Sequence, residues 1–336
     1  MGWLLPTMTP ERLANQRDVV KNERRQGVDN EPYGQVDERM YAALYPGRHP
    51  YSWDVIGNMA DLSAASIEDV KEFFKTYYAP NNCTLSIAGD FDPSQTRALV
   101  ARYFGEIPPG DPINRMDEWI PELPKEIRLE MEDRVPLPRL YIAWHSPAYF
   151  KAGDADLELL ADIMATGKSS RLYKRLVYDL KIAQDVEAYQ EGREIAGLFR
   201  LQVTAREGHT LEEIEPIVIE EIEKLRTAPP TRDELERART RTLGNFLRGL
   251  ERIGGFGGRS DRLAAYNTFL GDPGQLEADF VRYQQATPAS LQNAAQRWLH
   301  QGHVVMRVLP FPRLEAGKTP ADLDRSRMPD IARPGS

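Results

Sequence analysis

Two stretches of the chain, 66–88 and 287–309, follow the same pattern of a capped amphipathic helix, a polar break and an apolar strand. In the first, Ser66 begins the helix as part of a capping box, Pro80 ends it, and residues 84–88 alternate as a strand. In the second, Thr287 begins the helix and residues 303–309 form the strand. This self-similarity predicts two α+β units in tandem.

The remaining elements follow from hydrophobic spacing and from helix start and stop signals. Capping boxes at Thr210/Glu213 and Thr231/Glu234 predict the starts of two long helices. The stretch 106–138 is rich in proline and charge, which predicts a linker with one extended segment at 127–131. Further helices are expected at 10–27, 36–44, 154–165 and 170–180, and further strands at 140–144, 182–190 and 197–205.

Charge and composition exclude several classes of protein. The net charge of -8 argues against a nucleic-acid-binding protein, and no apolar run is long enough to span a membrane. The single cysteine, Cys83, excludes an internal disulfide and a cysteine-based zinc site, and its place in a predicted strand indicates a buried thiol. The first residues lack a signal peptide and read like the middle of a domain, which predicts a truncated gene product or a piece of a longer polypeptide.

Short motifs along most of the chain together resemble the M16 (pitrilysin, insulinase and mitochondrial-processing-peptidase-like) family of zinc metallopeptidases. Each motif is weak alone, but their order and spacing are specific. They are Arg17-Asp18-Val19-Val20-x-x-Glu23-Arg24-Arg25, Asn30-x-Pro32-Tyr33-Gly34, His49-Pro50-Tyr51, Tyr77-Tyr78-x-Pro80-Asn81-Asn82, Gly89-Asp90-Phe91-Asp92, Tyr103-Phe104-Gly105 and Gly167-Lys168-Ser169-Ser170-Arg171-Leu172-Tyr173.

The resemblance implies α+β domains of the LuxS/metallohydrolase-like type that pair as a clamshell around a peptide. Residues 1–110 would be the C-terminal part of a first M16 domain that is incomplete at its N-terminus. Residues 111–138 would be a linker, 139–310 a second, inactive M16 domain, and 311–336 a tail or a connector to a second half. The sequence does not give the compartment; if the complete protein carries a signal peptide, it lies upstream of Met1 and the periplasm is the expected location.

The resemblance also implies a zinc site, of which this sequence carries one part. Members of the family bind zinc through a His-x-x-Glu-His motif and a distant glutamate, and the motif's own glutamate acts as the base. By resemblance Glu23 is that distant ligand, with Asn22 and Arg24 as supporting residues, but the motif occurs nowhere in the chain. Gln16 stands where many members have another glutamate. Without the resemblance, Glu23 would be an ordinary solvated side chain.

The second domain of active relatives contributes an arginine and, seven residues later, a tyrosine to the substrate. The resemblance assigns these positions here to Tyr178 and, six residues later, Gln184, which keep hydrogen-bonding capacity but lack the positive charge. A helix surface without a substrate role is an equal alternative. Arg171 is a third expected substrate contact. The Gly167–Ser170 stretch resembles a shortened substrate loop, and the glycines at 254–258 predict a flexible joint between helices.

The remaining charged and histidine residues show no catalytic pattern. His49, His145 and His209 are isolated in the sequence, and His300 with His303 is expected to be a surface pair. The acidic run Glu212–Glu223 predicts a solvated helix face.

Two functions are consistent with the sequence and with the family resemblance. The first is part of an M16-type zinc-dependent metalloendopeptidase, inactive as this chain alone, whose partners are a peptide substrate, a missing N-terminal segment and a second half or subunit. The second is a non-catalytic M16-like subunit that binds peptides or scaffolds an active partner.

Overall fold

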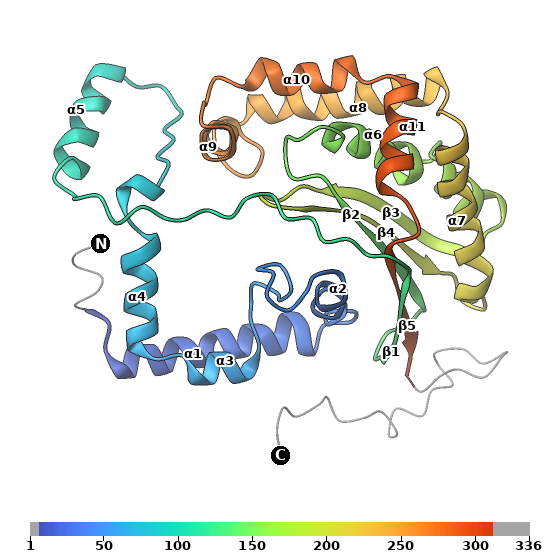
Figure 1. Cartoon of the computed structure of the whole chain (residues 1–336), viewed down its shortest axis with the longest axis horizontal. Coiled ribbons are helices and arrows are strands. Elements are labelled where there is room, and N and C mark those ends of the chain that lie inside the picture. The colour runs from blue at the N-terminus through green and yellow to red at the C-terminus, as the bar shows by residue number, and fades with distance from the viewer. Residues whose placement is uncertain (1–6, 312–336) are drawn as a thin grey trace. The chain divides into compact units, whose positions relative to one another are not determined.

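The computed structural model describes residues 7–311 as a mixed α+β protein that divides into two compact units. The first unit comprises 7–21, Asn58–Met116 and Leu243–Phe280, and the second Asn22–Gly57, Asp117–Thr242 and 281–311. Figure 1 shows the elements, which are α1 (Pro10–Arg24), η2 (Arg25–Asp29), α2 (Val36–Leu44), α3 (Met59–Ala64), α4 (Ile67–Tyr77), η3 (Pro80–Asn82), α5 (Pro93–Phe104), β1 (Ile127–Asp133), β2 (Arg139–Ser146), α6 (Asp154–Ala165), η4 (Tyr173–Asp179), β3 (Ala183–Glu191), β4 (Gly197–Ala205), α7 (Leu211–Thr227), α8 (Arg232–Glu251), α9 (Arg259–Leu270), α10 (Leu276–Gln285), α11 (Pro288–Trp298) and β5 (His303–Pro310).

The second unit is built around a five-stranded sheet with the order β1-β5-β2-β4-β3. β1 pairs with β5 in parallel, and the other neighbours are antiparallel. The stretch expected to be a linker therefore contains an edge strand of this sheet, because Ile127 to Asp133 lie in register with Val304 to Pro310. The extended segment expected at 127–131 is this strand, which continues to Asp133, and its pairing partner is far away in sequence.

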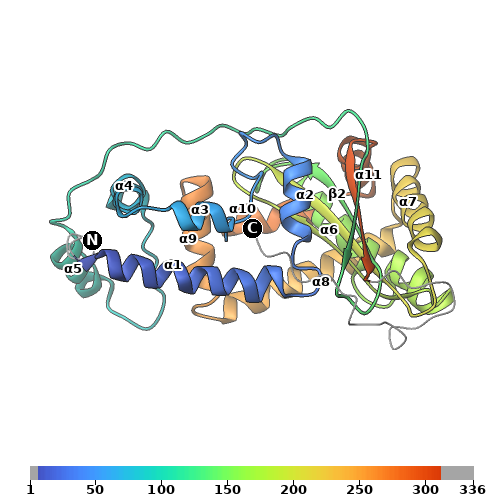
Figure 2. The ribbon, with the colours of Figure 1, turned by 90° about the horizontal axis from the view of Figure 1, so that it is seen from below.

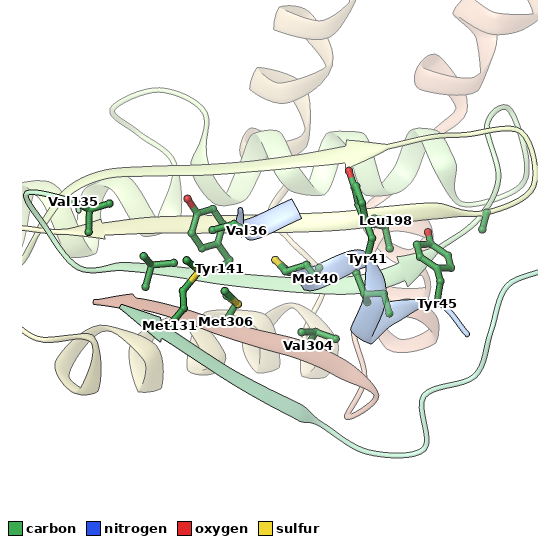
Figure 3. Close-up of a cluster of buried hydrophobic side chains, with 14 residues drawn as sticks. Val36, Met40, Tyr41, Tyr45, Met131, Val135, Tyr141, Leu198, Val304 and Met306 are labelled. Carbon is green, nitrogen blue, oxygen red and sulfur yellow. The ribbon is translucent and has the colours of Figure 1, made fainter. Parts of the chain in front are cut away.

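Helix α2 covers one face of this sheet. Val36, Met40 and Leu44 recur every four residues, Tyr41 lies three residues before Leu44, and all four are at most 5% exposed. They pack with Tyr141, Ala143 and Leu198 and with β5 residues Val304, Met306 and Val308 (Figure 3). Full burial of each aliphatic side chain of this size contributes about 1.5–3 kcal/mol before entropy losses.

The opposite face is covered by α6, α7 and α11 (Figures 1 and 2). Because side chains alternate along a strand, Ile142 and Trp144 point to this face and are at most 1% exposed. The predicted capping boxes at Thr210, Thr231 and Thr287 are present at the starts of α7, α8 and α11. The second unit is thus a three-layer α/sheet/α structure with a closed core.

The first unit has helices but, among the described residues, no strand. Its buried hydrophobic residues there are Phe246 and Tyr266, whereas many large apolar side chains are exposed. Residues 84–88 were predicted to be a strand, and this prediction is wrong for the described chain: they have no regular secondary structure and no ladder partner among the described residues. A strand requires a neighbour to satisfy its backbone groups. For the same reason Cys83 is exposed, not buried as predicted.

Two predicted helices differ from expectation because part of each is π-helical. The first ends at Arg24 and continues as a π-helical turn from Arg25 to Asp29. The expected helix at 170–180 is mostly the π-helix Tyr173–Asp179. No helix within residues 7–311 has the length and apolarity that a membrane crossing requires.

Candidate functional site

Glu23 lies in the last turn of α1 and is exposed. No hydrogen bond or ion pair joins it to another described side chain. Gln16 is seven residues earlier on the same helix, is also exposed, and shares its face because two helical turns separate the two positions. The free carboxylate of Glu23 is available to a ligand or to another polypeptide.

Arg24 fixes the end of α1. Its guanidinium is buried, donates to the carbonyl oxygen of Gly57, and donates from Nη2 to Glu38 Oε2 at 2.7 Å. Asn22 Oδ1 accepts from Arg25 Nη1 at 2.7 Å. Arg24 therefore supports Glu23 by holding the helix end that carries it, and Asn22 is engaged with its own helix.

The described residues do not by themselves fit a zinc ion. Zinc sites with catalytic activity need three protein ligands, and no group of three His, Cys, Asp or Glu side chains gathers anywhere within 7–311. Glu23 supplies one carboxylate. Any zinc site that uses Glu23 needs ligands from outside the described residues.

Arg171 forms a bidentate ion pair with Glu234. Its Nε and Nη2 donate to the two carboxylate oxygens at 2.7 and 2.9 Å, and both side chains are less than one-fifth exposed. Burial alone would raise the pKa of Glu234, but the hydrogen bonds from Arg171 and from Thr231 outweigh it and lower the pKa to about 2. This pair links the start of α8 to the loop before η4.

Tyr178 and Gln184 lie on either side of the turn from η4 to β3, and both are exposed, Tyr178 by 71%. Gln184 stands where the ladder between β3 and β4 shifts register, between Ala183 and Asp185. Such a bulge redirects a side chain out of the regular alternation. A π-helix followed by a bulge thus displays two hydrogen-bonding side chains that are six residues apart in sequence and open to solvent.

The two glycine-rich stretches are turns. Gly167 has φ +83°, and its carbonyl oxygen accepts from Ser170 N at 3.1 Å and from Ser170 Oγ at 2.7 Å. Residues 252–258 form bends and turns between α8 and α9, as the breaker pattern predicted. Gly255 and Gly257, with φ of +78° and +73°, adopt a conformation that other residues rarely take.

The prediction of a fully solvated acidic face on α7 is wrong at two positions. Glu215 and Glu221 are each 6% exposed. Glu215 accepts from Arg128 Nη2 at 2.6 Å and from Arg307, and Glu221 accepts from Arg175 Nη1 at 2.7 Å. These arginines lie on β1, β5 and η4, so the burial depends on contacts between residues far apart in sequence.

The histidine predictions also need correction. His303 is 7% exposed and lies 3.2 Å from Glu126, so it is not a surface residue. His49 and His145, isolated in the sequence, both contact the ring of Tyr45 in the fold, with centroid distances of 4.5 and 5.1 Å. Burial lowers the pKa of His145 to about 4. His49 Nδ1 accepts from Tyr51 N–H, which leaves Nε2 to donate to the Trp119 carbonyl oxygen.

Sequence reasoning missed Arg200, a buried charge in the middle of β4. It pairs with Asp37 of α2 and approaches Glu191 Oε2 and the Tyr41 hydroxyl, each at 3.4 Å. Burial alone would lower the pKa of Arg200, but Asp37 raises it above its usual value. An arginine within an apolar strand indicates a buried acidic partner. Here the ion pair between Arg200 and Asp37 holds α2 on the sheet.

The sequence profile described as "Peptidase M16 inactive domain" matches residues 64–242, which is more than half of the chain. The chain belongs to the peptidase M16 family.

Proteins of similar sequence support the assignment to this family. The zinc protease PqqE of Helicobacter pylori is 25% identical over 245 residues, which covers 70% of this chain and 54% of that protein. An uncharacterized zinc protease of Bacillus subtilis, YmfH, is 24% identical over 258 residues, covering 73% of this chain and 58% of that protein. The chain spans about half the length of the curated relatives it matches.

Solved structures show the same fold. The crystal structure of a protease from Helicobacter pylori has a TM-score of 0.81 at 22% identity and covers 90% of this chain and 73% of that chain. The peptidase M16 inactive domain from Pseudomonas fluorescens has a TM-score of 0.77 at 19% identity and covers 92% and 72%. The predicted α+β fold of M16 type is confirmed.

Proposed function

We propose that this chain is part of an M16-type zinc-dependent metalloendopeptidase that cleaves peptides or small unfolded proteins, and that it is inactive by itself. The proposal rests on one observation about this member of the M16 family. Glu23, at the anchored end of α1, offers one exposed carboxylate, and residues 7–311 place no second or third zinc ligand near it. A His-x-x-Glu-His segment from outside this sequence would supply the remaining ligands and the base.

In this proposal residues 1–110 form the C-terminal part of the first M16 domain, and residues 139–310 form the second. Residues 111–138 connect them, and the tail or inter-half linker expected at 311–336 lies, beyond Phe311, outside the described residues. Bound zinc would supply Lewis-acid chemistry only in the completed protein. The role of Glu23 is to complete the ligand set, and the role of Arg24 is to hold Glu23 in place through Gly57 and Glu38.

The second domain would contribute substrate contacts from Tyr178 and Gln184. Both are exposed and lie at an irregular turn, where they can donate hydrogen bonds to a peptide. Arg171 is proposed as the weakest contact of the three, because its guanidinium is already held by Glu234.

The second candidate function is a non-catalytic M16-like subunit that binds peptides or scaffolds an active partner. Two observations favour it. The second unit has a closed hydrophobic core that needs no metal, and Glu23 is the one candidate zinc ligand identified among the described residues. The two candidates differ in what an extended protein should do.

The test begins with the coding sequence upstream of Met1, which should contain His-x-x-Glu-His in the same frame. The protein extended by that segment should hydrolyse an unstructured peptide, and the chain 1–336 should not. In the extended protein Glu23→Gln should lower kcat/KM by more than the roughly 10–100-fold expected for an outer-sphere partner. Glu31→Gln, a change at an exposed loop position, is the matched control and should leave the rate unchanged. An extended protein without peptidase activity would favour the non-catalytic subunit.

A further inference from the structure

The chain passes from the first unit to the second in a stretch, 108–124, that has neither helix nor strand. Met116 ends a segment of the first unit, and Asp117 begins one of the second. Both backbone groups of Trp119 are bound within the second unit. Its N–H donates to the Ile195 carbonyl oxygen at 2.9 Å, and its own carbonyl oxygen accepts from His49 Nε2 at 3.0 Å. Trp119 is therefore a point at which the linker is attached to the second unit.

The hydrogen bonds of His49 fit only the neutral imidazole ring. Nδ1 lies 3.0 Å from the backbone nitrogen of Tyr51, whose N–H can only donate, so Nδ1 must carry a lone pair. Nε2 faces the Trp119 carbonyl oxygen, which can only accept, so Nε2 must carry the proton. A second proton on Nδ1 would point at the Tyr51 N–H, and that hydrogen bond would be lost.

The surroundings of His49 do not compensate a positive charge. The side chain is 0% exposed, and its ring lies between Tyr45 of α2 and Trp119, with both centroid distances 4.5 Å. No ion pair joins His49 to a carboxylate within residues 7–311. Burial accordingly lowers the pKa of His49. A charged ring gains hydration only by leaving this site.

Three neighbouring groups would oppose that charge because each carries or acquires positive charge. They are His145 of β2, Arg48 of the same loop, and Arg193. The Arg48 guanidinium lies 5.3 Å from the centre of the Trp119 ring, and that of Arg193 lies 5.1 Å from the centre of the Tyr51 ring. The packing around His49 thus favours the neutral ring from several elements.

The acidic groups nearby are engaged elsewhere. Glu191 pairs with Arg193, and Glu194 interacts with Tyr51. Glu126, seven residues after Trp119, lies 3.2 Å from His303 Nε2 at the start of β5. A proton on His303 would strengthen that contact, so acid acts in opposite directions at the two ends of the segment 119–126.

We propose that protonation of His49 releases Trp119 and the loop 46–52, so that the attachment of the linker to the second unit depends on pH. With a neutral ring, both backbone groups of Trp119 are held. With a charged ring, His49 leaves its buried site, and the bonds to Tyr51 and Trp119 break. The linker is then first held at Glu126 and β1. This inference is independent of the zinc ligand and goes beyond the proposed function.

The test is backbone hydrogen exchange of the full chain, measured by mass spectrometry from pH 7 to pH 4, with each rate divided by the intrinsic amide rate at that pH. Between pH 7 and pH 4, peptides that contain amides 46–52 and 118–120 should lose protection at least about tenfold more than amides 303–309 of β5. An equal loss in these segments, or no loss at 118–120 down to pH 4, would overturn the proposal.

Two variants assign the effect to His49. His49→Gln places an amide near the position of Nε2, which keeps a donor for Trp119, and it does not titrate in this range. The additional loss of protection at 118–120 should therefore disappear. His209→Gln, at a partly exposed position just before α7, is the matched control and should behave like the original chain. If the additional loss persisted in His49→Gln, another group would be responsible and the proposal would fail.

A measurement on the original chain covers the case in which His49→Gln does not fold. NMR of the chain with ¹³C-labelled histidine rings, assigned by elimination with variants at the other four histidines, follows the charge on His49 directly. Its titration midpoint should coincide with the midpoint for loss of protection at 118–120. A His49 ring that becomes charged while amides 118–120 stay protected would contradict the proposal.

Discussion

At the scale of single residues, Arg24 shows how a charge positions a candidate ligand. Its guanidinium is buried and binds both a carbonyl oxygen and a carboxylate, while Glu23 beside it is exposed. The sequence placed Arg24 next to Glu23 but gave no sign that its partners are Gly57 and Glu38. Those contacts depend on how the chain returns after α2, which local spacing does not encode.

Arg24→Ala should lower the free energy of unfolding by about 1–3 kcal/mol, because hydrogen bonds to a charged group are lost and the Gly57 carbonyl is left without its donor. Glu38 is 39% exposed, so its carboxylate can be rehydrated, which keeps the loss below that of a fully buried pair. Urea unfolding followed by circular dichroism measures the change. Arg25→Ala, at the exposed neighbouring position, should change stability by less than about 0.5 kcal/mol; an equal loss at both positions would count against the anchor.

His145 predicts a specific dependence of stability on pH. Its ring packs against Tyr45 and near His49, bonds the backbone of Leu44, and leaves Nε2 without a hydrogen-bond partner among the described residues. Burial lowers its pKa from 6.5 to about 4, so the unfolded chain binds a proton first as the pH falls. Stability is therefore complete above about pH 6.5 and decreases between pH 6.5 and 4 by about 1 kcal/mol per pH unit.

Urea unfolding of the chain at pH 7, 6 and 5 measures this loss. His145→Gln should remove most of the decrease over that range, while the contribution of His49, whose pKa is also lowered by burial, persists. An unchanged pH dependence in the variant would show that another group is responsible.

At the scale of elements, sequence patterns predicted the second unit well because its helices carry local start signals. The capping boxes of α7 and α11 and the mostly apolar run of β4 are encoded by neighbouring residues. The strand expected at 84–88 failed for a different reason. Its alternating pattern is real, but no strand of the described residues pairs with it. The burial of Glu215 and Glu221 likewise comes from arginines on distant elements.

The candidate site was predictable only through the resemblance. Spacing alone gave Glu23 no distinction from other helix glutamates, and the bulge that exposes Gln184 depends on the register of β3 against β4. The π-helical turn before it could not be read from the helical periodicity of 170–180 either. The positions of such irregular elements are determined by tertiary packing and not by local sequence.

The turn from η4 to β3 should affect activity and not folding. Tyr178→Phe and Gln184→Ala should leave the free energy of unfolding of the chain within about 0.5 kcal/mol, because both side chains are exposed. In the extended protein each should lower kcat/KM for a peptide roughly tenfold, because a hydrogen bond to the reacting region is lost. Leu180→Ala, at an exposed position between them, is the control. Steady-state kinetics that are unchanged in both variants would remove the second domain from the substrate site.

At the scale of the whole molecule, the chain combines one closed unit with one that exposes much of its apolar surface. A unit whose described core contains Phe246 and Tyr266 alone among buried hydrophobic residues has little apolar burial to offset its chain entropy. The same unit carries most of α1, which spans Pro10–Arg24, whereas Glu23 belongs to the second unit.

The measurement that tests this account most directly is zinc content by elemental analysis of purified, dialysed protein. The chain 1–336 should contain less than about 0.1 zinc per molecule, and the protein extended by its upstream segment should contain about one, because three ligands are needed to hold the ion. Glu23→Gln in the extended protein should lower this content. Stoichiometric zinc in the chain 1–336 alone would contradict the account.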